Sequence, residues 1–122
     1  MTIVQTSMAT PWQIHAENKL LFLEEVGERA YRVDRMLAHL RQAQALDSIA
    51  ALIFGDFLGG LEPNGRNLIP EVLTRFAQEC PFPVIQIAGA GHGFLNTPLV
   101  LGAPARLTLG THIQLVTGIN FT

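Results

Sequence analysis

The residue of this sequence that is best suited to chemistry is a histidine between two glycines. Gly91, His92 and Gly93 come shortly after an apolar, strand-like run at residues 83–87. Glycine allows backbone conformations that are closed to other residues and lets a ligand or a second domain approach closely. We therefore expect His92 to be displayed, and a displayed histidine is a candidate general base because its unperturbed pKa lies near neutrality. The alternative is that the glycines form a turn that His92 only caps.

Two carboxylates stand at the end of another apolar run, far upstream. Residues 20–23 are Leu-Leu-Phe-Leu, and Glu24 and Glu25 follow them directly. Consecutive residues of a strand point to opposite sides, so only one of the two glutamates can face His92. Parallel neighbouring strands end at the same edge of a sheet, and this would bring a carboxylate and the imidazole together.

A third carboxylate, Asp56, follows the apolar run at residues 49–54. It could be a polar group at the edge of an active site. An aspartate after a strand is also a common turn former or helix cap. The residues alone leave both interpretations open.

Four short segments of the chain occur in an order and at spacings that indicate one family. They are residues 20–28, 31–37, 54–57 and 91–96. Together they resemble the LD-carboxypeptidase family of serine peptidases, which also contains the microcin-C immunity peptidases. The resemblance extends over nearly the whole chain, but it matches the C-terminal domain of that two-domain protein and not the N-terminal one.

The resemblance implies that the catalytic groups are divided between two domains. In the family, the N-terminal domain carries a nucleophilic serine, and the C-terminal domain supplies a glutamate and a histidine that match Glu24 and His92 here. His92 would take the proton of the serine hydroxyl and return it to the leaving amine, while Glu24 would orient the imidazole and stabilise the imidazolium. Neither Ser7, which we expect in an extended stretch, nor Ser48 lies in a glycine-rich elbow that would expose a nucleophile. We therefore expect a catalytic half that is inactive alone.

The same resemblance implies a substrate. The complete enzyme would hydrolyse the amide bond that joins an L-configured centre, such as that of diaminopimelate, to a terminal D-alanine in murein peptides. Two alternatives stay open: an immunity peptidase that cleaves a peptide-nucleotide antibiotic or a related conjugate, and a non-catalytic interaction domain of the same fold. The partners implied are the serine-bearing domain and the murein peptide, and no cofactor is implied. Without the serine domain, apolar and glycine-rich surface would be bare at the edge of Glu24 and His92, so we also expect a homodimer, formed through the edge around Trp12.

Hydrophobic periodicity predicts alternating strands and helices after residue 18. Residues 1–18 are unperiodic, with an extended or turn element at Thr10-Pro11-Trp12, and we interpret them as the remnant of an interdomain connection. Residues 19–122 then form one domain. The predicted strands are 19–24, 49–54 and 84–88, the predicted helices are 31–43 and 68–80, and short β-type runs follow at 99–102, 105–109 and 113–116.

This order of elements predicts an α/β fold. Three strands of the parallel type with two helices, followed by a short β meander that packs as a second sheet, give three layers. The resemblance implies the same arrangement as a three-layer swivelling β/β/α domain, whereas the pattern alone supports only α/β.

Composition and charge narrow the remaining functions. The chain has 122 residues and a formal net charge of −2, so it lacks the basic surface of a nucleic-acid-binding or membrane-binding domain. Its single cysteine, Cys80, excludes an internal disulfide and is expected to be structural, near a helix end. We expect His15, His39 and His112 on the surface, and no metal site, because no ligand pair has a suitable spacing. The chain contains no apolar run of membrane-spanning length and no secretory pattern, so we predict a cytoplasmic protein.

Overall fold

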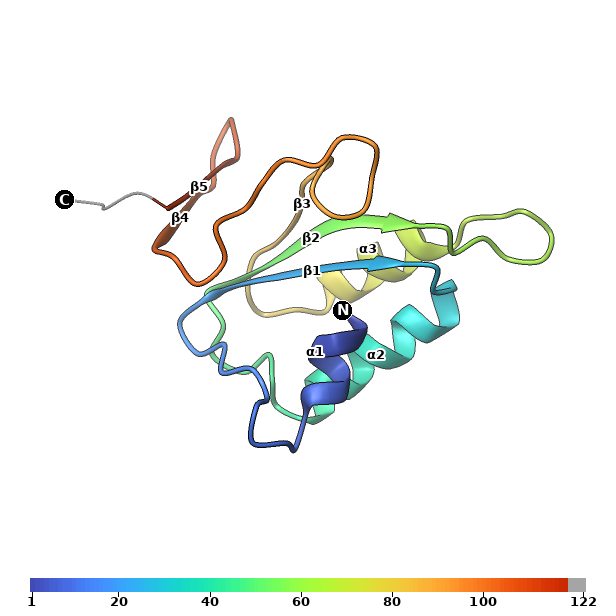
Figure 1. Ribbon diagram of the computed structural model, residues 1–122, viewed down its shortest axis with the longest axis horizontal. Helices are drawn as coiled ribbons and strands as arrows, with labels where there is room; N and C mark the ends of the chain where they lie inside the picture. Colours follow the sequence, from blue (N-terminus) through green and yellow to red (C-terminus); the bar gives the residue numbers. More distant parts are fainter. Residues whose placement is uncertain (119–122) are drawn as a thin grey trace.

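Two strand-helix-strand units form the centre of the structure. The computed structural model describes residues 1–118, and in each unit a helix connects a strand to its parallel neighbour (Figure 1). The elements in chain order are α1 (Thr2–Ser7), β1 (Leu20–Val26), α2 (Ala30–Gln42), β2 (Ala51–Leu58), α3 (Ile69–Gln78), β3 (Val84–Gln86), β4 (Ala105–Thr108) and β5 (Gln114–Thr117).

The strands β1, β2 and β3 form one parallel sheet with β2 in the middle. Leu20 of β1 is paired with Ala51 of β2, and Leu52 of β2 is paired with Val84 of β3. Figure 1 shows α2 and α3 on one side of this sheet. The carboxyl ends of the parallel strands lie at one edge, which is where α/β proteins place their functional groups.

The side chains of β1 alternate between the two faces of the sheet. Leu21 and Leu23 are buried in the core that the helices complete. Leu20 and Phe22 instead line a small cavity of about 70 Å³ on the other face, together with Ile53 of β2. This period of two residues lets one apolar strand be covered on both sides.

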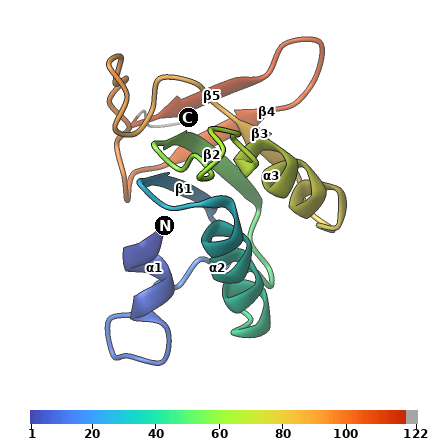
Figure 2. The ribbon, with the colours of Figure 1, turned by 90° about the vertical axis from the view of Figure 1, so that its right-hand side faces the viewer.

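A hairpin of β4 and β5 covers the second face of the sheet. The two strands are antiparallel, with Ala105 opposite Thr117, and Figure 2 shows them across the sheet from the helices. The three predicted layers of helices, parallel sheet and β structure are therefore confirmed. Residues 99–102, predicted as a β-type run, contain no strand and include a turn at Gly102 with a φ of +75°, so the second sheet of residues 1–118 has two strands instead of three.

The apolar faces of α2 and α3 fill the space under the sheet. Their buried side chains recur every three or four residues, which is the period of an amphipathic helix. Burial of one such side chain contributes about 1.5–3 kcal/mol. These side chains are Val33, Leu37 and Leu40 of α2, and Ile69, Val72, Leu73 and Phe76 of α3. Among the helices of residues 1–118, none combines the length and the apolar character needed to cross a lipid bilayer.

Helix α1 differs from the extended stretch that the sequence predicted for the N-terminal residues. Ser7, expected in that stretch, is buried in the helix, and its hydroxyl donates to the Val4 carbonyl oxygen at 2.7 Å. A helix of six residues is marginal alone and depends on tertiary contacts. Here those contacts are made by Thr2 with Glu25 and by Gln5 with the helix α2.

Candidate active site

Glu24 and His92 meet at the edge of the sheet. The Nδ1 atom of His92 lies 2.7 Å from Oε2 of Glu24, which is hydrogen-bonding distance. The His92 side chain is 60% exposed and that of Glu24 is 23% exposed. Because Nδ1 is engaged by the carboxylate, Nε2 is the nitrogen left for a further partner, as in a hydrolytic triad. The predicted meeting of these two residues, and the predicted display of His92, are both confirmed.

The alternation along β1 decides which glutamate faces the histidine. Glu25 points to the opposite face, where its Oε2 accepts hydrogen bonds from the Thr2 backbone N–H at 2.7 Å and the Thr2 hydroxyl at 2.6 Å. Burial raises the pKa of Glu25, but these bonds and the Val26 N–H outweigh it, so the pKa lies below its ordinary value. Glu24 is thus the carboxylate of the site, and Glu25 holds α1.

The glycines beside His92 allow the loop to lie directly on two carboxylates of the chain. Gly91 has a φ of +142°, and a Cβ there would lie 3.2 Å from both Glu24 Oε2 and the Asp56 Cβ. A Cβ on Gly93 would lie 2.9 Å from Asp56 Oδ2. Larger residues would push the loop away from the sheet, so glycine is required at these places by close packing within the chain itself.

Asp56 connects β2 to the same loop. At the register shift between the strands, Glu24 alone stands opposite two residues of β2, Gly55 and Asp56, which is a β-bulge. The Asp56 backbone N–H donates to the Ala90 carbonyl oxygen at 2.7 Å, and its Oδ1 accepts the Gly89 N–H at 3.1 Å. Asp56 therefore lies within β2, beside Glu24 and the His92 loop, and is neither a turn former after the strand nor a helix cap.

Asn96 closes the loop from its far end. Its Oδ1 accepts the Gly91 N–H at 3.3 Å, and the neighbouring Thr97 N–H donates to the Gly89 carbonyl oxygen at 2.6 Å. Asn96 lies at the end of the segment 91–96, one of the four segments on which the family resemblance rests. A loop that closes on its own backbone carries no periodic signal that would have revealed this contact.

The other candidate residues lie apart from this pair. His15 and His112 are exposed, as predicted, and His39 lies on the exposed surface of α2, where its Nδ1 hydrogen-bonds with Gln5 of α1. Cys80 lies just beyond α3, and its thiol donates to the Phe76 carbonyl oxygen at 3.1 Å, so its predicted structural place is confirmed. Within residues 1–118, no group of three or more histidine, cysteine or acidic side chains is arranged to hold a metal ion.

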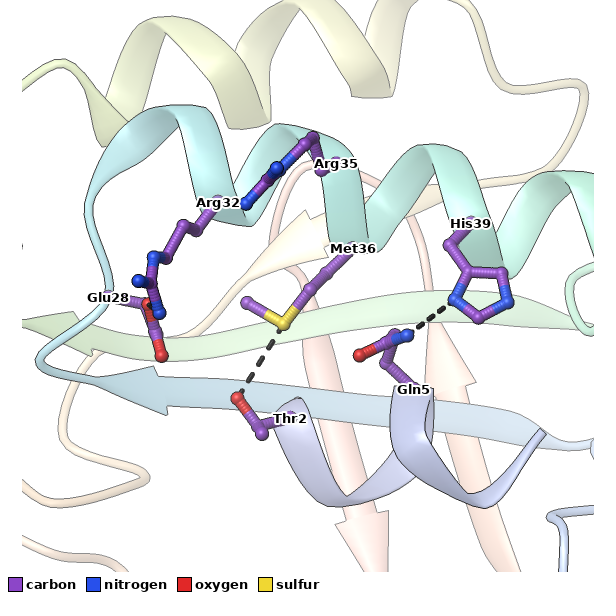
Figure 3. Close-up of a pocket in the computed structure, with 7 residues that line it drawn as sticks. All are labelled: Thr2, Gln5, Glu28, Arg32, Arg35, Met36 and His39. Atoms are coloured by element: carbon purple, nitrogen blue, oxygen red, sulfur yellow. Dashed lines mark hydrogen bonds and ion pairs between the residues drawn. The ribbon is translucent and has the colours of Figure 1, made fainter.

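A concave region lies on the helix side, between α1 and α2 and away from this pair. Its volume is about 390 Å³, and Figure 3 shows its side chains, with Gln5 directed at His39 and Thr2 at Met36. Arg32 is paired there with Glu28 at 3.4 Å. Neither Glu24 nor His92 lines this cleft, and most of its polar groups are engaged with one another.

Comparisons with known proteins identify the family of the chain. The family model of the LD-carboxypeptidase C-terminal domain matches residues 1–107. A protein of Rickettsia conorii named "Putative carboxypeptidase" is 37% identical over 119 residues, which are 98% of this chain and 36% of that protein. A "Probable murein peptide carboxypeptidase" of Bacillus subtilis is 33% identical over 109 residues, 88% of this chain and 34% of that protein.

A solved structure shows the same fold. The crystal structure of muramoyltetrapeptide carboxypeptidase from Oxalobacter formigenes matches with a TM-score of 0.82 and 29% sequence identity, covering 93% of this chain and 41% of that one. The chain thus spans about a third of the length of the curated relatives described above. With the family model matching 107 of its residues, the chain belongs to the family of LD-carboxypeptidase C-terminal domains.

Proposed function

We propose that this chain is the catalytic half of a serine-type LD-carboxypeptidase. The observation that carries the proposal is the contact of 2.7 Å between His92 Nδ1 and Glu24 Oε2 beside an exposed imidazole. A carboxylate on Nδ1 favours the tautomer in which Nε2 has a free electron pair, and this is the form that a general base requires.

In the proposed reaction, Nε2 of His92 takes the proton of a serine hydroxyl while the serine oxygen attacks the carbonyl carbon of the scissile amide. Glu24 stabilises the imidazolium that forms. The imidazolium then gives the proton to the leaving amine, and water repeats the sequence to release the acyl group from the serine. The expected products are a shortened murein peptide and D-alanine.

The serine belongs to a domain outside this chain in the proposal. Two facts support this division: the chain spans only about a third of its relatives, and Ser7 is buried in α1 with its hydroxyl bonded to Val4. The loop that carries His92 also exposes the apolar side chains of Phe94 and Leu95. Exposed apolar groups around a functional site are expected where another domain or a ligand covers it.

A chimera provides the test. The matching domain of the Oxalobacter formigenes enzyme is replaced by this chain, and release of D-alanine from a murein tetrapeptide is measured. We expect turnover that falls by at least about 10³-fold in His92→Ala. Glu24→Gln is expected to lose activity as well. Two matched controls should retain activity: Glu25→Gln, which removes the neighbouring carboxylate on the other face of the sheet, and His112→Ala, which removes another exposed histidine.

The outcomes separate the candidate functions. A folded chimera whose activity survives His92→Ala would refute the proposed role of the pair. Cleavage of a peptide-nucleotide conjugate in place of the tetrapeptide would favour the immunity peptidase. The chain without a serine domain is expected to give no multiple turnover on a diaminopimelyl-D-alanine peptide.

A further inference from the structure

The loop that carries His92 has little rigidity of its own. Gly89, Gly91 and Gly93 occur within five residues, and glycine has the largest backbone freedom of all residues. The distance of 2.7 Å between His92 and Glu24 therefore requires contacts from outside the loop. The described hydrogen bonds that join residues 89–93 to β2 come from Asp56, through its backbone N–H and its carboxylate.

The carboxylate of Asp56 is an unusual group to find there. Its Oδ1 accepts the Gly89 N–H, but its Oδ2 is buried and has no hydrogen-bond partner among the described residues. Buried polar atoms are almost always hydrogen-bonded, and one that is not lowers the stability of the fold. A side chain kept in this position at a cost in stability is expected to serve the site.

The bulge explains how Asp56 reaches both partners. It places Gly55 and Asp56 together opposite Glu24, so β2 presents one extra residue at the height of the catalytic carboxylate. The Asp56 carboxylate then lies under Gly93, and its Cβ lies near Gly91. His92 is between these two glycines, so a displacement of Asp56 moves the imidazole relative to Glu24.

We propose that Asp56 is a positioning residue, which fixes the glycine loop on β2 and thereby sets the hydrogen bond between His92 and Glu24. Asp56 acts through the loop and does not itself transfer a proton. The proposal rests on the proposed function of the pair for its catalytic meaning. The geometry it claims can nevertheless be measured on this chain without any turnover.

The test reads the imidazole by NMR. At an alkaline pH where imidazoles are neutral, the ¹⁵N shifts of His92 report which ring nitrogen carries the proton. In the unaltered chain we expect the Nδ1–H form, held by Glu24. In Asp56→Ala we expect a shift towards the mixture seen in free imidazole, with the Gly89 amide exchanging about tenfold faster because its acceptor is lost. Asp56→Asn keeps an acceptor for Gly89 and is expected to keep both values.

Two controls separate positioning from general stability. Leu73→Ala opens a cavity in the helix core and lowers the unfolding free energy, but it should leave the His92 nitrogen shifts unchanged. Asp34→Ala removes an exposed carboxylate that pairs with Arg75 on the helix side, and it should leave them unchanged too.

A second variant covers the case in which Asp56→Ala does not fold. Gly93→Ala keeps the carboxylate but introduces a Cβ 2.9 Å from Oδ2, and it is expected to move the His92 shifts in the same direction. Wild-type shifts in Asp56→Ala, or in Gly93→Ala where the first variant is unfolded, would overturn the proposal. So would an Asp56→Asn variant that behaves like Asp56→Ala. None of these measurements uses substrate. The proposal for Asp56 can therefore be refuted while the chimera remains active, and the proposed function can be refuted while the NMR results hold.

Discussion

Replacement of Gly55 by alanine tests how closely the loop that carries His92 packs on the sheet. A Cβ at Gly55 would overlap the Ala90 carbonyl oxygen and lie 2.6 Å from Cζ of Phe22. Carbon atoms in contact are normally about 3.5–4.0 Å apart, so the Phe22 ring and the loop both have to move by roughly 1 Å. The Ala90 oxygen also accepts the Asp56 N–H at 2.7 Å, so the loop cannot retreat without weakening that hydrogen bond.

The size of the effect follows from these contacts. Overpacking of a well-packed site costs about 1–3 kcal/mol, and a lost backbone hydrogen bond costs about 1 kcal/mol. Alanine in place of glycine also stabilises the folded state by about 0.4–1 kcal/mol, because it reduces the conformational freedom of the unfolded chain. We therefore expect Gly55→Ala to lower the free energy of unfolding by about 1–3.5 kcal/mol. With a urea dependence of about 1–3 kcal/mol per M, the unfolding midpoint falls by roughly 1 M.

Urea unfolding followed by circular dichroism measures this change. Gly110→Ala is the matched control, because a Cβ there meets nothing within 4 Å, and its midpoint should equal or slightly exceed that of the unaltered chain. Equal midpoints for the two variants would refute the packing of the loop on β2 that the site requires.

Three further predictions concern other parts of the molecule. Since the pKa of Glu25 is lowered in the fold, its contribution to stability is present above the unfolded value of about 4.3 and is lost as the pH falls through the lowered pKa. The loss of thermal stability in Glu25→Gln, relative to the unaltered chain, should therefore shrink below about pH 4.3, and a loss that stays constant with pH would contradict this. Burial raises the pKa of the Cys80 thiol, although Arg41 opposes it, so its alkylation at neutral pH should be slower than that of a free thiol and should reach that rate in urea. The exposed Phe94 side chain predicts self-association, measured as a sedimentation coefficient that rises with concentration and falls back in Phe94→Ser; a monomer at every concentration would be evidence against it.

The central elements were predictable because each has its own local signal. The continuous apolar runs that ended at Glu24 and near Asp56 predicted β1 and β2, and the spacing of Val33, Leu37 and Leu40 predicted α2. The edge shared by Glu24 and His92 followed from the parallel arrangement alone. In these cases the positions of the apolar residues along the sequence directly reflect which side chains are buried in the fold.

The remaining features depend on contacts between distant residues. Helix α1 has a sequence rich in β-branched residues, so no local pattern predicts a helix there. Its partners Glu25 and His39 lie far along the chain. The bulge at Asp56 could not be predicted from the sequence either, because a shift of register becomes visible only when the pairing of the two strands is known. The choice between Glu24 and Glu25 needed the family resemblance before the structure settled the direction of each side chain.

The register shift opposite Glu24 constrains the length of the chain more strictly than its composition. Phe57 packs its ring edge-to-face on Phe54 at a centroid distance of 5.6 Å, and the two share one face only because the bulge takes up one residue between them. Removal of a residue there would abolish the bulge that places Gly55 and Asp56 together opposite Glu24. Residues 63–66, in contrast, are exposed in the connection to α3. Insertions and deletions among relatives should therefore accumulate in that connection and be absent between Phe54 and Phe57, which would make the spacing within β2 a more durable trace of common descent than the identity of its residues.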